Sequence, residues 1–360
     1  MILPPTRFAG WQPLHARLLL ALLLALCGYG MALALQPTPA GKPVTVDLSR
    51  TDLALYQTVA NRVGEGESYY SAVVAEQRAR NYPLRPVVTV RLPTLATMTG
   101  AIGAEAATLL LRLLAFVAIA AVTLRLRAVA GSKPLWAAAT FLAAASMILL
   151  TVPAMTYWHE SWTALLIVIS LSCRSRERWA ASVSLGLAAA LFRELALPYL
   201  CVMALLALRE RNRAEAAAWT AAALVFFAAL AAHAVALGAY VHSGDPVSPG
   251  WASIGGWAFV LELVQRCTLF ALLPLPLVAV FLPLALLGWA SLGRGTGDRA
   301  ALLLLLYVAA FMLIGRPDNF YWGILIAPLL PIGLAFAPTA LRDLTAAAAD
   351  RSAAPASAAA

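Results

Sequence analysis

The chain has 360 residues, of which 62% are hydrophobic and only 12% are charged, and its mean hydropathy is +0.81. This composition excludes an ordinary water-soluble domain. The formal net charge of +9 is compatible with a nucleic-acid partner, but the arginines occur in small clusters between apolar runs. That distribution is typical of orientation signals in membrane proteins, so we expect a membrane-embedded protein without a nucleic-acid partner.

Apolar runs follow one another along the whole chain, and about 20 apolar residues suffice for a helix that crosses a bilayer. Ten runs occur, at Leu18–Leu35, Ala106–Leu124, Leu135–Val152, Trp162–Cys173, Trp179–Phe192, Leu195–Leu208, Ala216–Tyr240, Cys267–Ala290, Ala300–Ile314 and Trp322–Ala337. They predict an all-α polytopic membrane protein with about ten transmembrane helices. The fifth and sixth runs are short, so they form either two thin spans or a hairpin with an outward tip. We interpret the first run as a retained signal anchor, although a cleaved signal is the alternative.

Basic residues follow alternate spans, which places both chain ends in the cytoplasm under the positive-inside rule. The first outer loop, residues 36–105, is then long, and four short polar segments face the same side. We expect one domain over residues 1–340, loop included, and a disordered, alanine-rich cytoplasmic tail over 341–360.

The first outer loop contains a predicted amphipathic surface helix over residues 52–63, because Leu53, Tyr56, Ala60 and Val63 recur at helical spacing. Asp52 stands at its start. Two interpretations remain open: Asp52 belongs to a capping box with Ser49, or its carboxylate takes part in catalysis.

Two arginines of the same loop, Arg85 and Arg91, flank an extended stretch that Pro83, Pro86 and Pro93 punctuate. An arginine fork binds phosphate or carboxylate well, whereas interfacial arginines also neutralise lipid headgroups. Both roles are compatible with the sequence.

Charged pairs also stand at two outer span ends, in "YWHES" with His159 and Glu160 and in "FREL" with Arg193 and Glu194. Charges inside apolar stretches are costly unless they line a polar cavity, so such residues are functional candidates. The alternative for "FREL" is a salt bridge that braces a short helix pair. The alternative for "YWHES" is an aromatic belt with an interfacial histidine.

The segment "GRPDNFYWG", residues 315–323, places Arg316, Asp318 and Tyr321 between two apolar runs. It is either a membrane-surface turn with an aromatic belt or one wall of an active site. Because these charges face the same side as the other polar clusters, we favour the active site.

The four cysteines form no CxxC pattern, and no Cys/His ligand spacing predicts a metal site. The sequence therefore leaves the cofactor unknown. A divalent metal is compatible with the chain, but no ligand motif is seen.

The order of these features resembles the GT-C superfamily of membrane glycosyltransferases. The stretches "DLALYQTVANRV", "RLPTLA", "WHESW", "LFRELALPYL" and "GRPDNFYWG" are similar to bacterial members linked to cell-surface glycopolymers, and the shared architecture covers nearly the whole chain. Members use a sugar linked to a lipid phosphate, and a carboxylate of the first outer loop is the base. Asp52 matches that carboxylate by position, although the paired "DE" or "DxD" pattern is absent.

The resemblance implies a glycosyltransferase of the bacterial cytoplasmic membrane that acts at its extracytoplasmic face. It would move a hexose or pentose from a polyprenyl-phosphate donor to a glycan or lipid acceptor. Asp52 and Glu160 are the candidate catalytic residues. The candidate residues for binding the donor phosphate and sugar are Arg85, Arg91, His159, Arg193, Glu194, Arg316, Asp318 and Tyr321. The alternative function is a polytopic transporter or flippase for a lipid-linked saccharide, whose charges would lie nearer the midplane.

Overall fold

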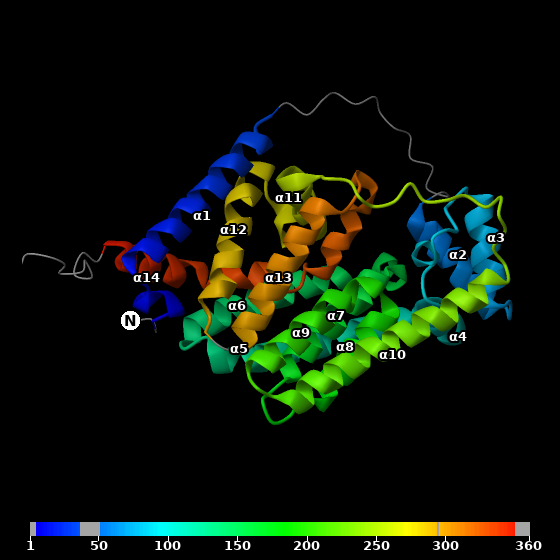
Figure 1. Ribbon diagram of the computed structural model, residues 1–360, viewed down its shortest axis with the longest axis horizontal. Coiled ribbons are helices and arrows are strands. Elements are labelled where there is room, and N and C mark those ends of the chain that lie inside the picture. The colour runs from blue at the N-terminus through cyan, green and yellow to red at the C-terminus, as the bar shows by residue number, and fades with distance from the viewer. Residues whose placement is uncertain (1–4, 37–50, 294, 350–360) are drawn as a thin grey trace, which may run out of the picture. The chain divides into compact units, whose positions relative to one another are not determined.

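The computed structural model describes residues 5–36, 51–293 and 295–349 (Figure 1). Within these ranges the chain is helical, and its only β-type pairing is an isolated bridge between Arg85 and Val247. Five helices are long and apolar enough to cross a membrane: Pro13–Ala34, Ala104–Val129, Lys133–Thr151, Arg213–Gly238 and Thr296–Leu313. The prediction of a helical, multi-pass membrane protein is therefore confirmed, whereas the number of ten spans stays a prediction.

The residues group into two compact units rather than the single domain that we expected. Unit 1 comprises Met1–Pro37, Val122–Ser146 and Ser253–Ala360, and unit 2 comprises Thr38–Ala121 and Met147–Ala252. Helices α5 (Ala104–Val129) and α6 (Lys133–Ile148) each pass from one unit to the other. We describe each unit by itself.

The first part of unit 2 is a small helical layer built from the segment between α1 and α5, which we predicted to be the first outer loop. It contains α2 (Asp52–Gly64), α3 (Tyr69–Ala79), the 3₁₀ turn η3 (Val87–Thr89) and α4 (Thr94–Ile102). The predicted helix over 52–63 is therefore confirmed as a helix that ends at Gly64, whereas its place at a membrane surface stays a prediction. A Cβ atom on Gly100 would lie 2.9 Å from the backbone nitrogen of Gly64. The absence of side chains at this crossing lets α2 and α4 approach closely.

The second part of unit 2 is a group of apolar helices that lie side by side (Figure 1). Its elements are η4 (Leu149–Thr151), η5 (Pro153–Tyr157), α7 (His159–Cys173), α8 (Ala180–Phe192), η6 (Glu194–Ala196), α9 (Leu197–Arg209) and α10 (Arg213–Gly238). Helices α8 and α9 have 13 residues each. At 1.5 Å per residue each is only about 20 Å long, shorter than the ~30 Å hydrocarbon core of a bilayer.

Helix α7 is the centre of that group, and its residues from His159 to Leu171 are all buried. Its side chains meet polar partners inside the bundle: the Ser170 hydroxyl donates to the Ser182 carbonyl at 2.6 Å and lies 2.7 Å from the Tyr199 hydroxyl. On the facing side, a Cβ on Gly186 would come within 2.5 Å of the Trp219 ring. Small residues thus allow the close helix packing that membrane interiors favour.

Unit 1 joins the first helix of the chain to its last third. Its elements are η1 (Arg7–Gly10), α1 (Pro13–Ala34), α11 (Gly256–Cys267), η7 (Leu269–Leu272), α12 (Leu275–Ser291), α13 (Thr296–Leu313), η8 (Pro317–Leu325), η9 (Leu330–Ala335) and α14 (Ala337–Ala349). Helix α1 packs against α12 and α14. The Thr6 backbone N–H donates to the Asp343 carboxylate at 2.6 Å, and the Arg17 guanidinium donates to the Ala348 carbonyl at 2.9 Å.

The last predicted span, Trp322–Ala337, is not one α-helix. The chain there forms η8 and η9, and nearly every residue is buried. Pro328 and Pro331 have no N–H for the α-helical bond and their rings clash with the preceding turn, so a continuous helix is disfavoured. A Cβ on Gly333 would lie 2.0 Å from the Ala285 carbonyl oxygen, so this segment presses its backbone directly onto α12.

The end of the chain also differs from the expectation of a disordered tail over 341–360. Residues 341–349 complete α14, and Asp343, Leu344 and Ala347 are buried on it. Residues 350–360 lie outside the described residues.

Candidate active site in unit 2

Asp52 occupies the first turn of α2 and is held by a tyrosine. The helix is capped by Thr51, whose hydroxyl accepts from the Ala54 N–H at 3.3 Å. The Asp52 carboxylate instead accepts from the Tyr82 hydroxyl at 2.6 Å. The proposed partner of Asp52 in a capping box, Ser49, lies outside the described residues.

Tyr82 follows α3 and was not among the predicted site residues. Burial and the negative charge of Asp52 raise its pKa above the usual range for a phenol. Tyr82 consequently keeps its proton at physiological pH and acts as a permanent donor that orients Asp52.

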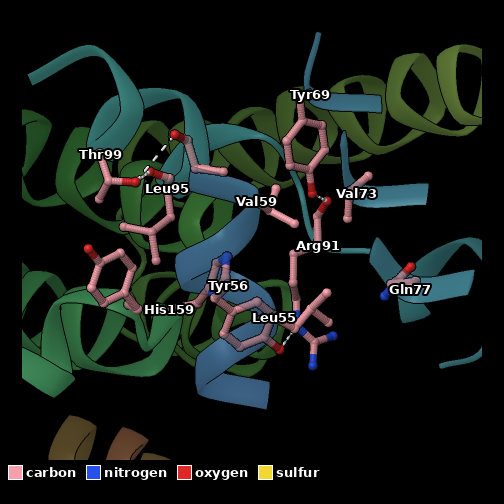
Figure 2. A pocket seen from close by; sticks show the side chains of 12 residues that line it. Leu55, Tyr56, Val59, Tyr69, Val73, Gln77, Arg91, Leu95, Thr99 and His159 are labelled. Atoms are coloured by element: carbon pink, nitrogen blue, oxygen red, sulfur yellow. Dashed lines mark hydrogen bonds between the residues drawn. The ribbon is translucent and has the colours of Figure 1, made fainter. Parts of the chain in front are cut away.

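Arg91 lies where η3 leads into α4 and is joined to α2 through Tyr56. Its Nε donates to the Tyr56 hydroxyl at 3.3 Å, and its Nη1 donates to the Val88 carbonyl at 3.2 Å. The Tyr69 hydroxyl donates to the Arg91 carbonyl at 2.6 Å (Figure 2). Desolvation by burial raises the pKa of Tyr56 to about 12, so this phenol also stays protonated.

The charged residues of "YWHES" and "FREL" form one ion-pair chain between α7 and η6. Glu160 and Arg193 are each 1% exposed, and the Glu160 Oε1 lies 2.6 Å from the Arg193 Nε. Arg193 also pairs with Glu194, which lies 3.6 Å from Arg91. Burial would raise the pKa of Glu194, but the positive charges of Arg193 and Arg91 prevail and lower it.

The contact between Glu160 and Arg193 satisfies charge but not hydrogen bonding. Neither carboxylate oxygen of Glu160 has a hydrogen-bond partner among the residues that the structure describes. The separation is that of an ion pair, whereas the orientation does not make a hydrogen bond. A buried carboxylate without hydrogen bonds costs free energy and usually indicates a bound water or a ligand.

A pocket opens beside this chain of charges (Figure 2). Its cavity volume is about 20 Å³, and it is lined by Leu55, Tyr56, Val59, Tyr69, Val73, Gln77, Arg91, Leu95, Ala96, Thr99, Tyr157 and His159. The His159 ring meets the Tyr56 ring edge-on with centroids 4.8 Å apart. The structure thus brings together five predicted site residues at or next to the pocket: Arg91, His159, Glu160, Arg193 and Glu194. Asp52 does not line the pocket, but it precedes the lining residue Tyr56 by one turn of α2.

Arg85 has a different environment from the one expected for a phosphate ligand. Its guanidinium donates to the backbone carbonyls of Ser243 (2.7 Å) and Asp245 (3.0 Å). Arg78 binds the same loop after α10: its Nε and Nη2 donate to the Asp245 carboxylate at 2.6 and 2.7 Å. Arg78 lowers the pKa of Asp245 well below its usual range. Arg85 therefore connects the loop after α10 to the segment between α3 and η3 by hydrogen bonds.

The turn with Arg316, Asp318 and Tyr321 belongs to unit 1. Arg316 and Asp318 form a two-point pair, with Nε–Oδ1 at 3.1 Å and Nη2–Oδ2 at 2.8 Å. Asp318 is largely exposed, whereas Tyr321 is buried. Asp318 thus orients the guanidinium of Arg316.

A second ion-pair cluster of unit 2 stands at the other end of α7. The Arg174 Nε and Nη2 donate to the two carboxylate oxygens of Glu215 at 2.9 and 2.6 Å. Arg174 also contacts Glu210 at 2.5 Å, and the Asn212 amide donates to Glu215 at 3.1 Å. Sequence reasoning interpreted Arg174 only as an orientation signal, because nothing local predicts its partner 41 residues away.

No group of three or more His, Cys, Asp or Glu side chains within residues 5–36, 51–293 and 295–349 has the arrangement of a metal site. Comparison of the chain with protein-family models, with curated proteins and with solved structures finds no match.

Proposed function

We propose that the protein is a glycosyltransferase of the bacterial cytoplasmic membrane that works at the extracytoplasmic face. It transfers a sugar from a polyprenyl-phosphate donor to a glycan or lipid acceptor of the cell surface. One observation carries this proposal: Asp52, in the first helix after the first span, is oriented by Tyr82 and stands one helical turn before Tyr56, which lines the pocket together with Arg91 and His159.

Asp52 is the base in this proposal. The acceptor hydroxyl oxygen attacks the anomeric carbon and forms the new glycosidic bond while its proton passes to Asp52. The bond between the anomeric carbon and the phosphate oxygen breaks, and the electron pair leaves with the polyprenyl phosphate. Asp52 suits this role better than Glu160, because Asp52 is partly exposed whereas Glu160 is 1% exposed and ion-paired with Arg193.

Arg91 is the arginine of unit 2 that we assign to the leaving phosphate, because its side chain lines the pocket and is partly exposed. Positive charge aimed at a leaving phosphate stabilises the transition state. Arg193 and Glu194 are positioning residues in this proposal. Glu194 pairs with Arg91, and Arg193 pairs with Glu160 of α7. Arg316 of unit 1, with Asp318 and Tyr321, stays a separate candidate for binding the donor phosphate.

The proposal is tested with Asp52→Asn in purified protein supplied with a panel of polyprenyl-phosphate hexoses and pentoses and with surface glycan as acceptor. Transfer should fall by at least about 100-fold, the usual range for loss of a general base, while the melting temperature stays near wild type. Glu262→Gln is the control, because it removes a carboxylate of an exposed pair with Arg266 and should leave transfer unchanged.

Two other outcomes would contradict the proposal. If the Asp52→Asn variant retains full transfer, Asp52 is not the base and Glu160 becomes the next candidate. Movement of the intact lipid-linked sugar across liposomes, without any transfer by the wild type, would favour the flippase.

A further inference from the structure

Two buried histidines of unit 2 differ in how their ring nitrogens are satisfied. His233 is 2% exposed, with Nε2 at 3.2 Å from the Val90 carbonyl and Nδ1 at 3.2 Å from the Tyr70 hydroxyl. His159 is 4% exposed, yet its Nδ1 has no hydrogen-bond partner in the described part of the chain. A buried polar atom without a partner costs free energy, so His159 is maintained at a cost that His233 does not carry.

The other polar groups of the pocket are mostly engaged within the protein. The Tyr69 hydroxyl donates to the Arg91 carbonyl, and the Thr99 hydroxyl donates to the Leu95 carbonyl at 2.8 Å (Figure 2). Besides His159, Gln77 has a buried polar atom, Oε1, without a partner among the described residues. The remaining walls are aliphatic or aromatic, so the pocket offers only a few hydrogen-bonding positions.

These features distinguish between the three parts of a lipid-linked sugar. A phosphate would seek the guanidinium of Arg91 rather than a pocket walled by leucine, valine and alanine. A polyprenyl tail would seal the His159 Nδ1 in hydrocarbon without a partner, which is unfavourable. A sugar ring fits both properties, because its C–H faces pack on aromatic rings while its hydroxyls donate or accept.

We propose that this pocket is a subsite for the neutral sugar of the donor, and that a sugar hydroxyl completes the hydrogen bonding of His159 Nδ1. This inference rests on the proposed function and adds the group that the pocket recognises. The space between the walls is narrow, so one hydroxyl-bearing edge of the ring enters while the rest of the ring faces the mouth.

The test compares bare polyprenyl phosphate with polyprenyl-phosphate glucose, mannose and galactose, using the melting temperature of the full-length protein in detergent. For wild type, at least one sugar-bearing lipid should bind about tenfold tighter than the bare lipid, the value of one good hydrogen bond. His159→Phe keeps the aromatic ring and removes both nitrogens. It should abolish this difference and keep the stabilisation by the bare lipid.

The ligand-free proteins supply a second measurement of opposite sign. His159→Phe should melt at the wild-type temperature or higher, because it removes an unpartnered polar atom. The matched control His233→Phe should melt lower by on the order of 3 °C or more, because the Val90 carbonyl and Tyr70 hydroxyl lose their partner.

Each outcome bears on a separate claim. No stabilisation of wild type by any polyprenyl phosphate would overturn the proposed function, whereas equal stabilisation by bare and sugar-bearing lipids would overturn only the sugar subsite. A ligand-free His159→Phe that melts as low as His233→Phe would show that His159 binds a resident water. If His159→Phe does not fold, Gln77→Met takes its place: an undiminished sugar-dependent difference in that variant overturns the subsite.

Discussion

Each end of α7 has a buried arginine–glutamate pair, but the two pairs differ in their hydrogen bonding. At the C-terminal end, Arg174 and Glu215 share two aligned hydrogen bonds, and Asn212 donates a third bond to the same carboxylate. At the N-terminal end, Glu160 contacts Arg193 at 2.6 Å but neither of its oxygens is hydrogen-bonded within the described residues. One cluster is complete, whereas the other has unused bonding capacity beside a pocket.

This difference separates structural charge from functional charge. A buried ion pair whose lone pairs are filled holds helices together, and its loss leaves an uncompensated charge in a low-dielectric interior. A buried pair with unfilled lone pairs retains capacity for a ligand, because proteins rarely leave such atoms unsatisfied without a reason. The comparison therefore assigns stability to the Arg174 end and recognition to the Glu160 end.

The largest effect is expected at the complete cluster. Glu215→Gln leaves Arg174 with only the partly exposed Glu210 and should destabilise the protein by about 3–5 kcal/mol, the usual cost of breaking a buried pair. Transfer per folded molecule should stay at the wild-type rate. Unfolding in a denaturing detergent titration measures the first quantity, and single-turnover transfer measures the second.

A smaller loss of stability is expected at the incomplete cluster. Glu160→Gln removes no formed hydrogen bond and leaves Arg193 paired with Glu194, so the cost should be about 1–2 kcal/mol. Transfer should nevertheless fall, since the ion-pair chain that reaches Arg91 is altered. A destabilisation as large as that of Glu215→Gln would remove the distinction between the two ends.

The smallest effect is expected at the turn of unit 1. There the guanidinium of Arg316 is already paired with Asp318, so its substitution tests whether recognition needs unsatisfied hydrogen-bonding atoms. Arg316→Gln should weaken donor use by about tenfold, because a hydrogen bond to a charged group contributes roughly 1.5–3 kcal/mol. Asp318→Asn should show a smaller loss, since Asp318 only orients the guanidinium. Transfer rate is measured against donor concentration; a wild-type dependence in Arg316→Gln would identify the segment as a membrane-surface turn.

Features encoded locally were predictable from the sequence. The helix over 52–63 follows from its apolar period. The i,i+4 spacing of Glu262 and Arg266 likewise accounts for their ion pair at 2.6 Å. The meeting of "YWHES" with "FREL" was suspected only from shared sidedness. Its geometry depends on how α7 packs against α8, which no local pattern contains.

Long-range partners were not predictable for the same reason. Tyr82 is 30 residues from Asp52, and Asp245 is 167 residues from Arg78, so nothing in their own neighbourhoods marks the contacts. Arg85 looked like a phosphate ligand because an arginine fork suits phosphate and peptide carbonyls equally. The last apolar run was interpreted as a helix because hydropathy outweighed its two internal prolines.

That last run has a consequence for how the chain is made. A segment that enters the membrane from the translocon normally does so as an α-helix, since every backbone group must be bonded before water is left behind. The succession of η8 and η9 lacks that self-sufficiency, and its Gly333 backbone lies against Ala285 and Gly288 of α12. We therefore expect this segment to be integrated after α12 is in place. This late step of biogenesis would depend on packing against α12 rather than on the hydrophobicity of the segment alone.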